Sequence, residues 1–206
     1  MFDEKQLTAL RERVSESMSS KRFFHTACVE KMAARLGELY CPNEIPMLRA
    51  AALLHDVTKE YSTEKHLNIL AASGIIVSKQ DTLTPKTLHA RTAALLIPTE
   101  FPEFAHPDLV SAVRYHTTGR ADMTLAEKLI YLADYIDDSR TFPDCVTLRE
   151  MFFGKAPENM VRDDRLSHLD EVLIASFDMT VSGLLADGAI ISEDTVAARN
   201  FLLLNR

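Results

Sequence analysis

The chain has 206 residues, of which 47% are hydrophobic and 26% are charged, and its formal net charge is −7. This composition is typical of a soluble globular protein of one sizeable domain rather than of a disordered chain. The acidic balance argues against binding to a nucleic-acid backbone as the main task, because such proteins usually carry a basic face. A small anionic substrate is not excluded, since a few local cations and a metal ion can outweigh the global charge.

The three cysteines, Cys28, Cys41 and Cys145, are scattered and form no CxxC motif. This pattern predicts free thiols in a reducing compartment rather than a zinc ribbon or a disulfide framework. Residues 1–13 are charged and lack the apolar stretch of a signal peptide, and no apolar run reaches membrane-spanning length. We therefore expect a cytoplasmic protein without a membrane partner, and the sequence leaves a homodimer open.

Helical periodicity extends through nearly the whole chain, which contains only 6 glycines and 8 prolines. The first helix is predicted to begin after Asp3, with Gln6 at the reciprocal position of a capping box. The second helix is predicted over residues 22–40, with His25 beside its apolar stripe. Five residues are expected to form that buried stripe: Phe24, Cys28, Met32, Leu36 and Leu39.

A third helix is expected to start near Pro46, since proline suits the first helical turn. Residues 47–54 are apolar except for Arg49, which predicts a helix at the centre of the fold. This helix leads directly into His55 and Asp56. A buried imidazole and a buried carboxylate are costly unless another group pairs with them, and a metal ion is one such partner.

The rest of the chain also has the pattern of helices, separated by connections at residues 75–84, 98–106 and 142–157, the last of them irregular. With no repeat or linker, one all-α domain over residues 1–206 is the economical interpretation. The remaining helices are predicted from Ser62 to Gly74, from Thr84-Pro85 onward, from Pro107 to Gly119, from Thr124 to Ile136, over 169–185, and from Ser192 to Leu204.

Six residues share a setting at or near the apolar stripe of a helix. Imidazole and carboxylate ligands together suit a mid-series transition metal such as iron or manganese. A lone histidine in this setting is more often a hydrogen-bonded core residue, but the recurrence of the setting favours one common site. The six are His25, His55, Asp56, His89, His116 and Asp134, whereas His66, His106 and His168 lack the setting and are interpreted as surface or structural residues.

Four motifs carry a family resemblance that covers residues 22–140 strongly and continues more weakly to residues 195–200. Their order resembles the HD-domain metal-dependent phosphohydrolases, and their details look like the YqeK-type subgroup, the symmetrical bis(5′-nucleosyl)-tetraphosphatases. The motifs are His55-Asp56-Val57-Thr58-Lys59, His89-Ala90, His116-Thr117-Thr118-Gly119, and Ala133-Asp134-Tyr135-Ile136 followed by Arg140.

The resemblance implies an all-α HD-type core over about residues 20–141, with additional C-terminal helices over about 157–206. It implies that an iron ion is held by His25, His55, Asp56 and Asp134, although manganese or another divalent transition metal would also suit these ligands. Whether a second metal binds near His89 and His116 stays open. The phosphate side of the nucleotide would be lined by Arg22, Lys59, His89, His116, Thr117 and Arg140.

The implied reaction is the symmetrical hydrolysis of diadenosine tetraphosphate to two ADP, by attack of a metal-bound water on a central phosphate. Asp56, Lys59 and His116 would be the catalytic residues, and His25, Asp56 and Asp134 would also face the substrate. Two alternatives remain at this stage. One is a nucleotidase or dNTP triphosphohydrolase acting on mononucleotides, and the other is a nucleotide-sensing binding module without catalysis.

Overall fold

The computed structural model of the protein describes residues 2–206, and within that range it contains α-helices and short 3₁₀ turns but no strand. The all-α prediction is therefore confirmed. The helices are α1 (Glu4–Ser17), α2 (Ser20–Tyr40), α3 (Ile45–Leu54), α4 (Thr63–Ala72), α5 (Lys79–Leu83), α6 (Leu88–Glu100), α7 (Pro107–Tyr115), α8 (Leu125–Ile136), α9 (Pro143–Gly154), α10 (Arg162–Ala186) and α11 (Glu193–Leu204).

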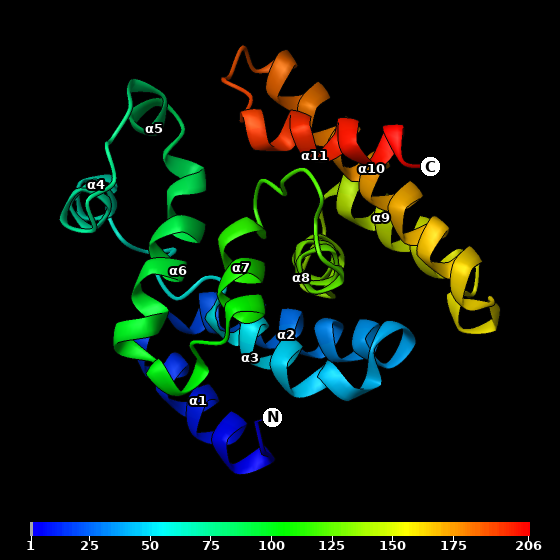
Figure 1. Cartoon of the computed structure of the whole chain (residues 1–206), viewed down its shortest axis with the longest axis horizontal. Helices are drawn as coiled ribbons and strands as arrows, with labels where there is room; N and C mark the ends of the chain where they lie inside the picture. Colours follow the sequence, from blue (N-terminus) through cyan, green and yellow to red (C-terminus); the bar gives the residue numbers. More distant parts are fainter. Residues whose placement is uncertain (1) are drawn as a thin grey trace.

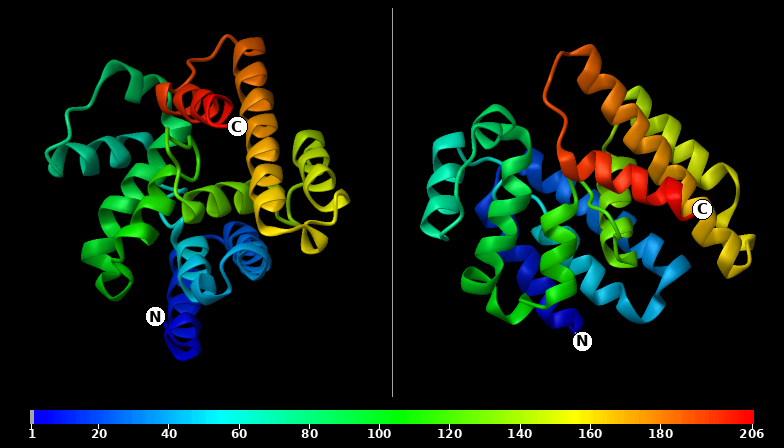
Figure 2. Two further views of the ribbon diagram at one scale, coloured as in Figure 1. Left: turned by 45° about the vertical axis from the view of Figure 1, so that its right-hand side comes forward. Right: turned by 45° about the horizontal axis from the view of Figure 1, so that its top comes forward.

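The helices form four groups around a shared core (Figure 1). Helices α1, α2 and α3 pack together at the N-terminal end, and α6, α7 and α8 cross above them. Helices α4 and α5 lie on one side of α6, whereas α9, α10 and α11 lie on the opposite side of the molecule, with α11 packed across α10 (Figures 1 and 2). Helix α3 contacts α1, α2, α7 and α8, so it is surrounded by helices.

Helix α3 is the most deeply buried element of this core, as its sequence predicts. Leu48 and residues 50–54 have no exposed surface, and Pro46 lies in the first turn. Burying a leucine side chain contributes about 1.5–3 kcal/mol, which explains why this apolar helix lies at the centre. The helix ends at Leu54, so His55 and Asp56 follow in a buried turn.

Several predicted helix starts are confirmed by their hydrogen bonds. Asp3 and Gln6 form a reciprocal capping box at α1, and Thr124 and Glu127 form another at α8. The Ser62 hydroxyl accepts a hydrogen bond from a backbone N–H in the first turn of α4. Each of these caps satisfies donors that a helix start leaves unpaired, which is typically worth about 1 kcal/mol.

The predicted buried stripe of the second helix is partly wrong. Met32 and Leu36 are buried, but Phe24 is 64% exposed and Cys28 is only half-buried. The buried face of α2 is turned toward α3 and α8 and includes His25 and Val29. The contacts with these two helices fix the rotation of α2, and the hydrophobicity of one phenylalanine does not outweigh them.

All three predicted connections contain helix. The segment 75–84 includes α5, which starts at a capping box between Ser78 and Asp81. Helix α6 continues through Pro98 to Glu100. The segment 142–157 contains α9, which begins at Pro143, where a proline costs no hydrogen bond. Helix α10 also starts earlier than predicted, at Arg162.

Gly119 lies where the C-terminal helices pack on the central ones. Its φ of +64° favours glycine, and a Cβ atom there would lie 2.7 Å from Cζ of Phe177 and 3.0 Å from Cβ of Ala198. Helices α10 and α11 therefore pack directly on the segment that follows His116. The division into a core over about 20–141 and C-terminal helices over about 157–206 stays a prediction. Within residues 2–206, no helix is long and apolar enough to cross a membrane.

Candidate active site

The site residues predicted from the sequence meet at one place, although they come from six segments of the chain. Helix α2 supplies Arg22 and His25, and the turn after α3 supplies His55, Asp56 and Lys59. The other contributions are His89 from the first turns of α6, His116 and Thr117 from the end of α7, Asp134 from the last turns of α8, and Arg140 from the segment after it.

Asp56 lies at the centre of this group, and its two carboxylate oxygens face different partners. Oδ2 accepts a hydrogen bond of 2.7 Å from Nη1 of Arg22. The same oxygen lies 3.5 Å from Nε2 of His55 and 3.9 Å from Nε2 of His25. Asp56 is 2% exposed, so this carboxylate depends on its protein partners rather than on water.

The Oδ1 oxygen of Asp56 faces two further imidazoles and an ammonium group. It lies 3.2 Å from Nε2 of His89, 3.8 Å from Nε2 of His116 and 3.6 Å from Nζ of Lys59. Lys59 also contacts Nε2 of His89 at 3.0 Å, and the hydroxyl of Thr117 lies 3.1 Å from Nε2 of His116. Asp56 therefore contacts both halves of the site: the Oδ2 side with Arg22, His25 and His55, and the Oδ1 side with Lys59, His89 and His116.

Backbone carbonyls fix which nitrogen of two histidines carries the proton. Nδ1 of His55 donates to the carbonyl of Ala52 at 2.6 Å, and Nδ1 of His116 donates to the carbonyl of Val113 at 2.7 Å. Because a carbonyl only accepts, the proton of each neutral ring is on Nδ1 and the Nε2 lone pair faces Asp56. This is the arrangement that metal-ligating histidines adopt.

His25 lies between acidic groups on the other side of Asp56. Its Nε2 is 2.9 Å from Oδ1 of Asp134, and its Nδ1 is 3.0 Å from the hydroxyl of Ser139 and 3.4 Å from Oδ2 of Asp137. Burial alone would lower the pKa of His25, but the interactions with Asp134 and Asp137 outweigh it and raise that pKa to about 9. Asp134 also accepts a hydrogen bond of 2.6 Å from Arg140.

The other titratable groups respond to the same surroundings. Burial opposes ionisation of Asp56 and Asp134, yet the neighbouring histidines hold the pKa of both carboxyl groups well below its usual range. Burial lowers the pKa of His89 to about 4, so this imidazole is neutral at neutral pH. Burial also lowers the pKa of His116.

A metal ion fits these residues. Nε2 of His25, Nε2 of His55 and Oδ1 of Asp56 are buried and, despite the close charged groups, make no hydrogen bond of regular geometry within the described structure. One ligand atom from each of His25, His55 and Asp134 lies within 4.8 Å of the others, and the same holds for His55, Asp56 and His116. Both sets offer nitrogen and oxygen donors, which suits a mid-series divalent metal.

The three histidines that the sequence assigned to surface or structural roles lie outside both sets. His66 is buried, and its Nδ1 is 2.8 Å from the hydroxyl of Thr92. Nε2 of His168 donates to the carbonyl of Phe152 at 3.0 Å. His106 is exposed and caps the start of α7.

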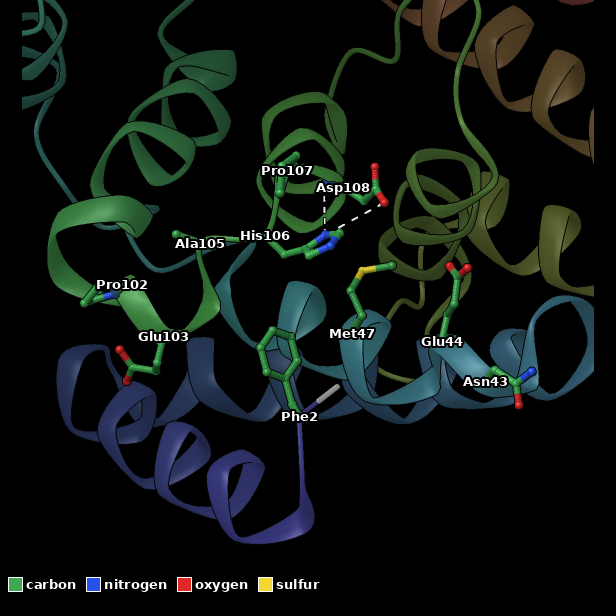
Figure 3. A pocket seen from close by; sticks show the side chains of 10 residues that line it. All are labelled: Phe2, Asn43, Glu44, Met47, Pro102, Glu103, Ala105, His106, Pro107 and Asp108. Atoms are coloured by element: carbon green, nitrogen blue, oxygen red, sulfur yellow. Dashed lines mark hydrogen bonds and ion pairs between the residues drawn. The ribbon is translucent and has the colours of Figure 1, made fainter.

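Two cavities differ in their relation to the site. One, of about 440 Å³, adjoins Lys59 and His89 and is also lined by Tyr61 and Lys86. The other, of about 470 Å³, lies between the start of the chain, α3 and the start of α7 (Figure 3). It includes none of the predicted site residues, and its one histidine, His106, pairs with Asp108.

Sequence reasoning missed two residues beside His25 and a third that holds their segment in place. Asp137 and Ser139 contact His25 directly, and Arg149 of α9 holds the segment that carries them. A signal for Asp137 was present, because it lies one helical turn beyond Asp134. Nothing in the sequence indicated Arg149, because the segment around it showed no clear pattern.

Comparison with known proteins gives the class to which this fold and site belong. The family model of the HD domain matches residues 22–138, and the chain therefore belongs to the HD-domain family. Membership implies dependence on a divalent metal ion, in agreement with the two donor sets.

Particular relatives are similar over almost the whole chain. A protein of Bacillus subtilis named bis(5′-nucleosyl)-tetraphosphatase, symmetrical, is 30% identical over 92% of this chain and 94% of its own length. A protein of the same name from Halalkalibacterium halodurans is 31% identical over 94% of this chain and 95% of its own length. A crystal structure from Clostridium acetobutylicum, described as a predicted HD superfamily hydrolase involved in NAD metabolism, has a TM-score of 0.82 and 28% identity, with both chains covered completely.

Proposed function

We propose that this protein is a metal-dependent hydrolase that cleaves diadenosine tetraphosphate symmetrically to two ADP. The observation that carries the proposal is the meeting of two histidine–carboxylate donor sets with the cations of Arg22, Lys59 and Arg140. The names of the relatives, which are similar over more than nine-tenths of the chain, support this choice of substrate. We further propose iron as the native metal, held by His25, His55, Asp56 and Asp134, and a cytoplasmic location.

The residues around the donor sets suit a polyphosphate. A divalent ion bound there would supply Lewis-acid activation of water and charge stabilisation at phosphorus. The ammonium of Lys59 and the guanidinium of Arg140 would offset charge on non-bridging oxygens, and the hydroxyl of Thr117 would donate to one of them. The cavity beside Lys59, with Tyr61 and Lys86 on its wall, would accept a further part of the nucleotide.

His89 and His116 have different roles in this proposal. A neutral His89 would hold a phosphate oxygen by hydrogen bonding rather than act as a proton donor, because its pKa is lowered to about 4. The proton on Nδ1 of His116 is committed to the carbonyl of Val113. A neutral His116 therefore offers its Nε2 lone pair, which can bind a metal but cannot donate to phosphate.

One experiment tests the metal and the substrate together. Protein purified without oxygen is analysed for metal content, incubated with diadenosine tetraphosphate, and its products are identified. We expect bound iron and two ADP per substrate. Hydrolysis to ATP and AMP, or no hydrolysis by metal-loaded protein, would overturn the proposal.

The same preparation is also incubated with dNTPs and nucleoside monophosphates. Preferential release of triphosphate from dNTPs would favour a triphosphohydrolase, and phosphate release from monophosphates would favour a nucleotidase. Nucleotide binding without turnover of any substrate would favour a sensing module.

A further inference from the structure

Asp137 is a buried carboxylate beside the site with no role in the reaction described so far. It follows the last residue of α8, has no exposed surface, and its Oδ2 has no hydrogen-bond partner within the described structure. Burying an ionised carboxylate is costly unless its partners compensate. Its nearest charged neighbours are His25, with Nδ1 at 3.4 Å, and Arg140, with Nε at 3.5 Å.

The other oxygen of this carboxylate orients a hydroxyl group. Oδ1 of Asp137 accepts hydrogen bonds from the backbone N–H of Ser139, at 2.8 Å, and from the Ser139 hydroxyl. Because that hydroxyl donates to Asp137, its lone pairs are free to accept from another group. Nδ1 of His25 lies 3.0 Å away and is the group in position to donate. Asp137 and Ser139 together thus favour a proton on Nδ1 of His25.

The consequence lies at the opposite nitrogen of the same ring. The form of the ring that binds a metal ion is the neutral one, and when its Nδ1 keeps the proton and donates it to a fixed acceptor, its Nε2 offers a lone pair. Nε2 of His25 faces Asp134 at 2.9 Å and Asp56 at 3.9 Å, inside one of the donor sets. His55 and His116 receive the same orientation from backbone carbonyls, whereas His25 receives it from side chains.

Helix α9 holds the segment that carries Asp137 and Ser139. The guanidinium of Arg149 donates to the carbonyl of Ile136 at 2.7 Å, to the carbonyl of Arg140 at 2.9 Å, and to the carbonyl of Asp137. Carbonyl groups at both ends of the segment 136–140 therefore accept hydrogen bonds from the same planar guanidinium group. This gives α9, which lies outside the segment matched by the family model, a connection to the metal site.

We propose that Asp137 is a positioning residue that, with Ser139, orients His25 and selects the tautomer in which Nε2 binds the metal ion. The proposal rests on the ligand role assigned to His25 under the proposed function. A carboxylate behind a metal-bound histidine fixes the ring and strengthens its donor nitrogen, and loss of such a partner costs about 10–100-fold in metal affinity.

The test replaces Asp137 by Asn, which has the same shape. In this variant, Oδ1 keeps its hydrogen bonds with Ser139, so the amide NH₂ takes the place of Oδ2. The NH₂ group then faces Nδ1 of His25 and Nε of Arg140, and because all three groups are donors, none can accept a hydrogen bond from another. We expect about 10–100-fold weaker metal binding, measured by competition with a chelator of known affinity. Asp138→Asn is the matched control, because Asp138 is the exposed neighbour and the charge change is the same.

Two further measurements separate positioning from a structural role. Metal-free Asp137→Asn should still unfold in one cooperative transition, at a lower midpoint than wild type because three donors meet at its buried amide, and metal affinity is compared where both proteins are fully folded. Excess metal should restore the rate of Asp137→Asn to near the wild-type rate. Persistent loss of rate with metal fully bound would overturn the proposal.

The remaining outcomes decide between this proposal and the proposed function. If wild type binds metal and Asp137→Asn binds it equally well, or Asp138→Asn weakens binding as much, the positioning role is wrong and the proposed function stands. If wild type binds no divalent metal, the proposed function fails first. Should Asp137→Asn not fold, Ser139→Ala removes the acceptor for His25, and wild-type metal affinity in that variant would overturn the proposal.

Discussion

The two sides of Asp56 both contain buried histidines but have opposite electrostatic character. On the Oδ2 side, His25 lies between Asp134 and Asp137, so acidic groups surround the imidazole. On the Oδ1 side, His89 contacts the ammonium of Lys59 and the imidazole of His116. Asp56 itself is the one carboxylate that both sides share.

This difference shows how neighbours divide one cluster into two tasks. Both histidines are buried, and burial lowers the pKa of each, yet the pKa of His25 is raised to about 9 and that of His89 is lowered to about 4. The number of adjacent carboxylates decides the sign. The Oδ2 side therefore favours a cation, whereas the Oδ1 side, with its neutral rings and its lysine, is suited to an anion such as phosphate.

The largest effect is expected when the shared carboxylate is removed. Asp56→Asn should lose bound metal and reduce hydrolysis of diadenosine tetraphosphate by more than about 100-fold, since even outer partners of metal ligands are worth 10–100-fold. Metal analysis and product release measure both losses. Asp108→Asn, at an exposed carboxylate away from the site, is the control and should match wild type. Full activity in folded Asp56→Asn would remove Asp56 from the centre of the mechanism.

Alanine variants of His25 and His89 test the difference between the Oδ2 side and the Oδ1 side directly. His25→Ala should lose metal, whereas His89→Ala should keep one metal ion per chain and lose about 100–1,000-fold in rate, the range expected for one hydrogen-bond donor to developing charge. Metal stoichiometry and kcat distinguish the two. If His89→Ala lowers the stoichiometry from two ions to one, the Oδ1 side holds a second metal, and its assignment to phosphate is wrong.

Loss of the lysine should have a smaller effect and leave the metal in place. Lys59→Ala removes an ammonium 3.0 Å from Nε2 of His89, and we expect kcat to fall about 100-fold, as for one donor to developing charge. Metal content should be unchanged. Lys79→Ala, at an exposed position on α5, provides the control. Unchanged kinetics in Lys59→Ala would show that this lysine does not stabilise charge in the reaction.

The sequence predicts well those parts of the fold that local physics determines. The apolar run of α3 leads to burial because each residue of that run loses contact with water, and the capping boxes at Asp3 and Thr124 satisfy their donors within four residues. The rotation of α2 could not be predicted in the same way. It depends on contacts with α3 and α8, and the exposed Phe24 shows how such contacts override side-chain hydrophobicity.

The candidate site shows the same limit. Its histidines and carboxylates stand out in the sequence because polar groups beside apolar stripes need partners. Arg149 does not stand out, because an arginine on a helix is usually solvated, and only the tertiary structure brings its guanidinium to the carbonyls after α8. The predicted helix boundaries fail for a related reason, since Pro98 inside α6 and Pro143 at the start of α9 look alike in sequence.

The smallest effect on the chemistry is expected at Gly119, where the C-terminal helices pack on the segment that follows His116. Gly119 and Gly188 both have positive φ, +64° and +61°, but a Cβ would collide with Phe177 only at Gly119. Gly188→Ala should cost about 1–2 kcal/mol of unfolding free energy from backbone strain alone. Gly119→Ala should cost about 1–3 kcal/mol more, because extra volume enters a packed interface.

Chemical denaturation of both glycine variants measures the difference, and metal affinity should stay near that of wild type in each. Equal destabilisation of the two would show that α10 and α11 yield easily at this contact. The contact of Gly119 with Phe177 and Ala198 would then contribute little to the packing of the C-terminal helices on the segment after His116.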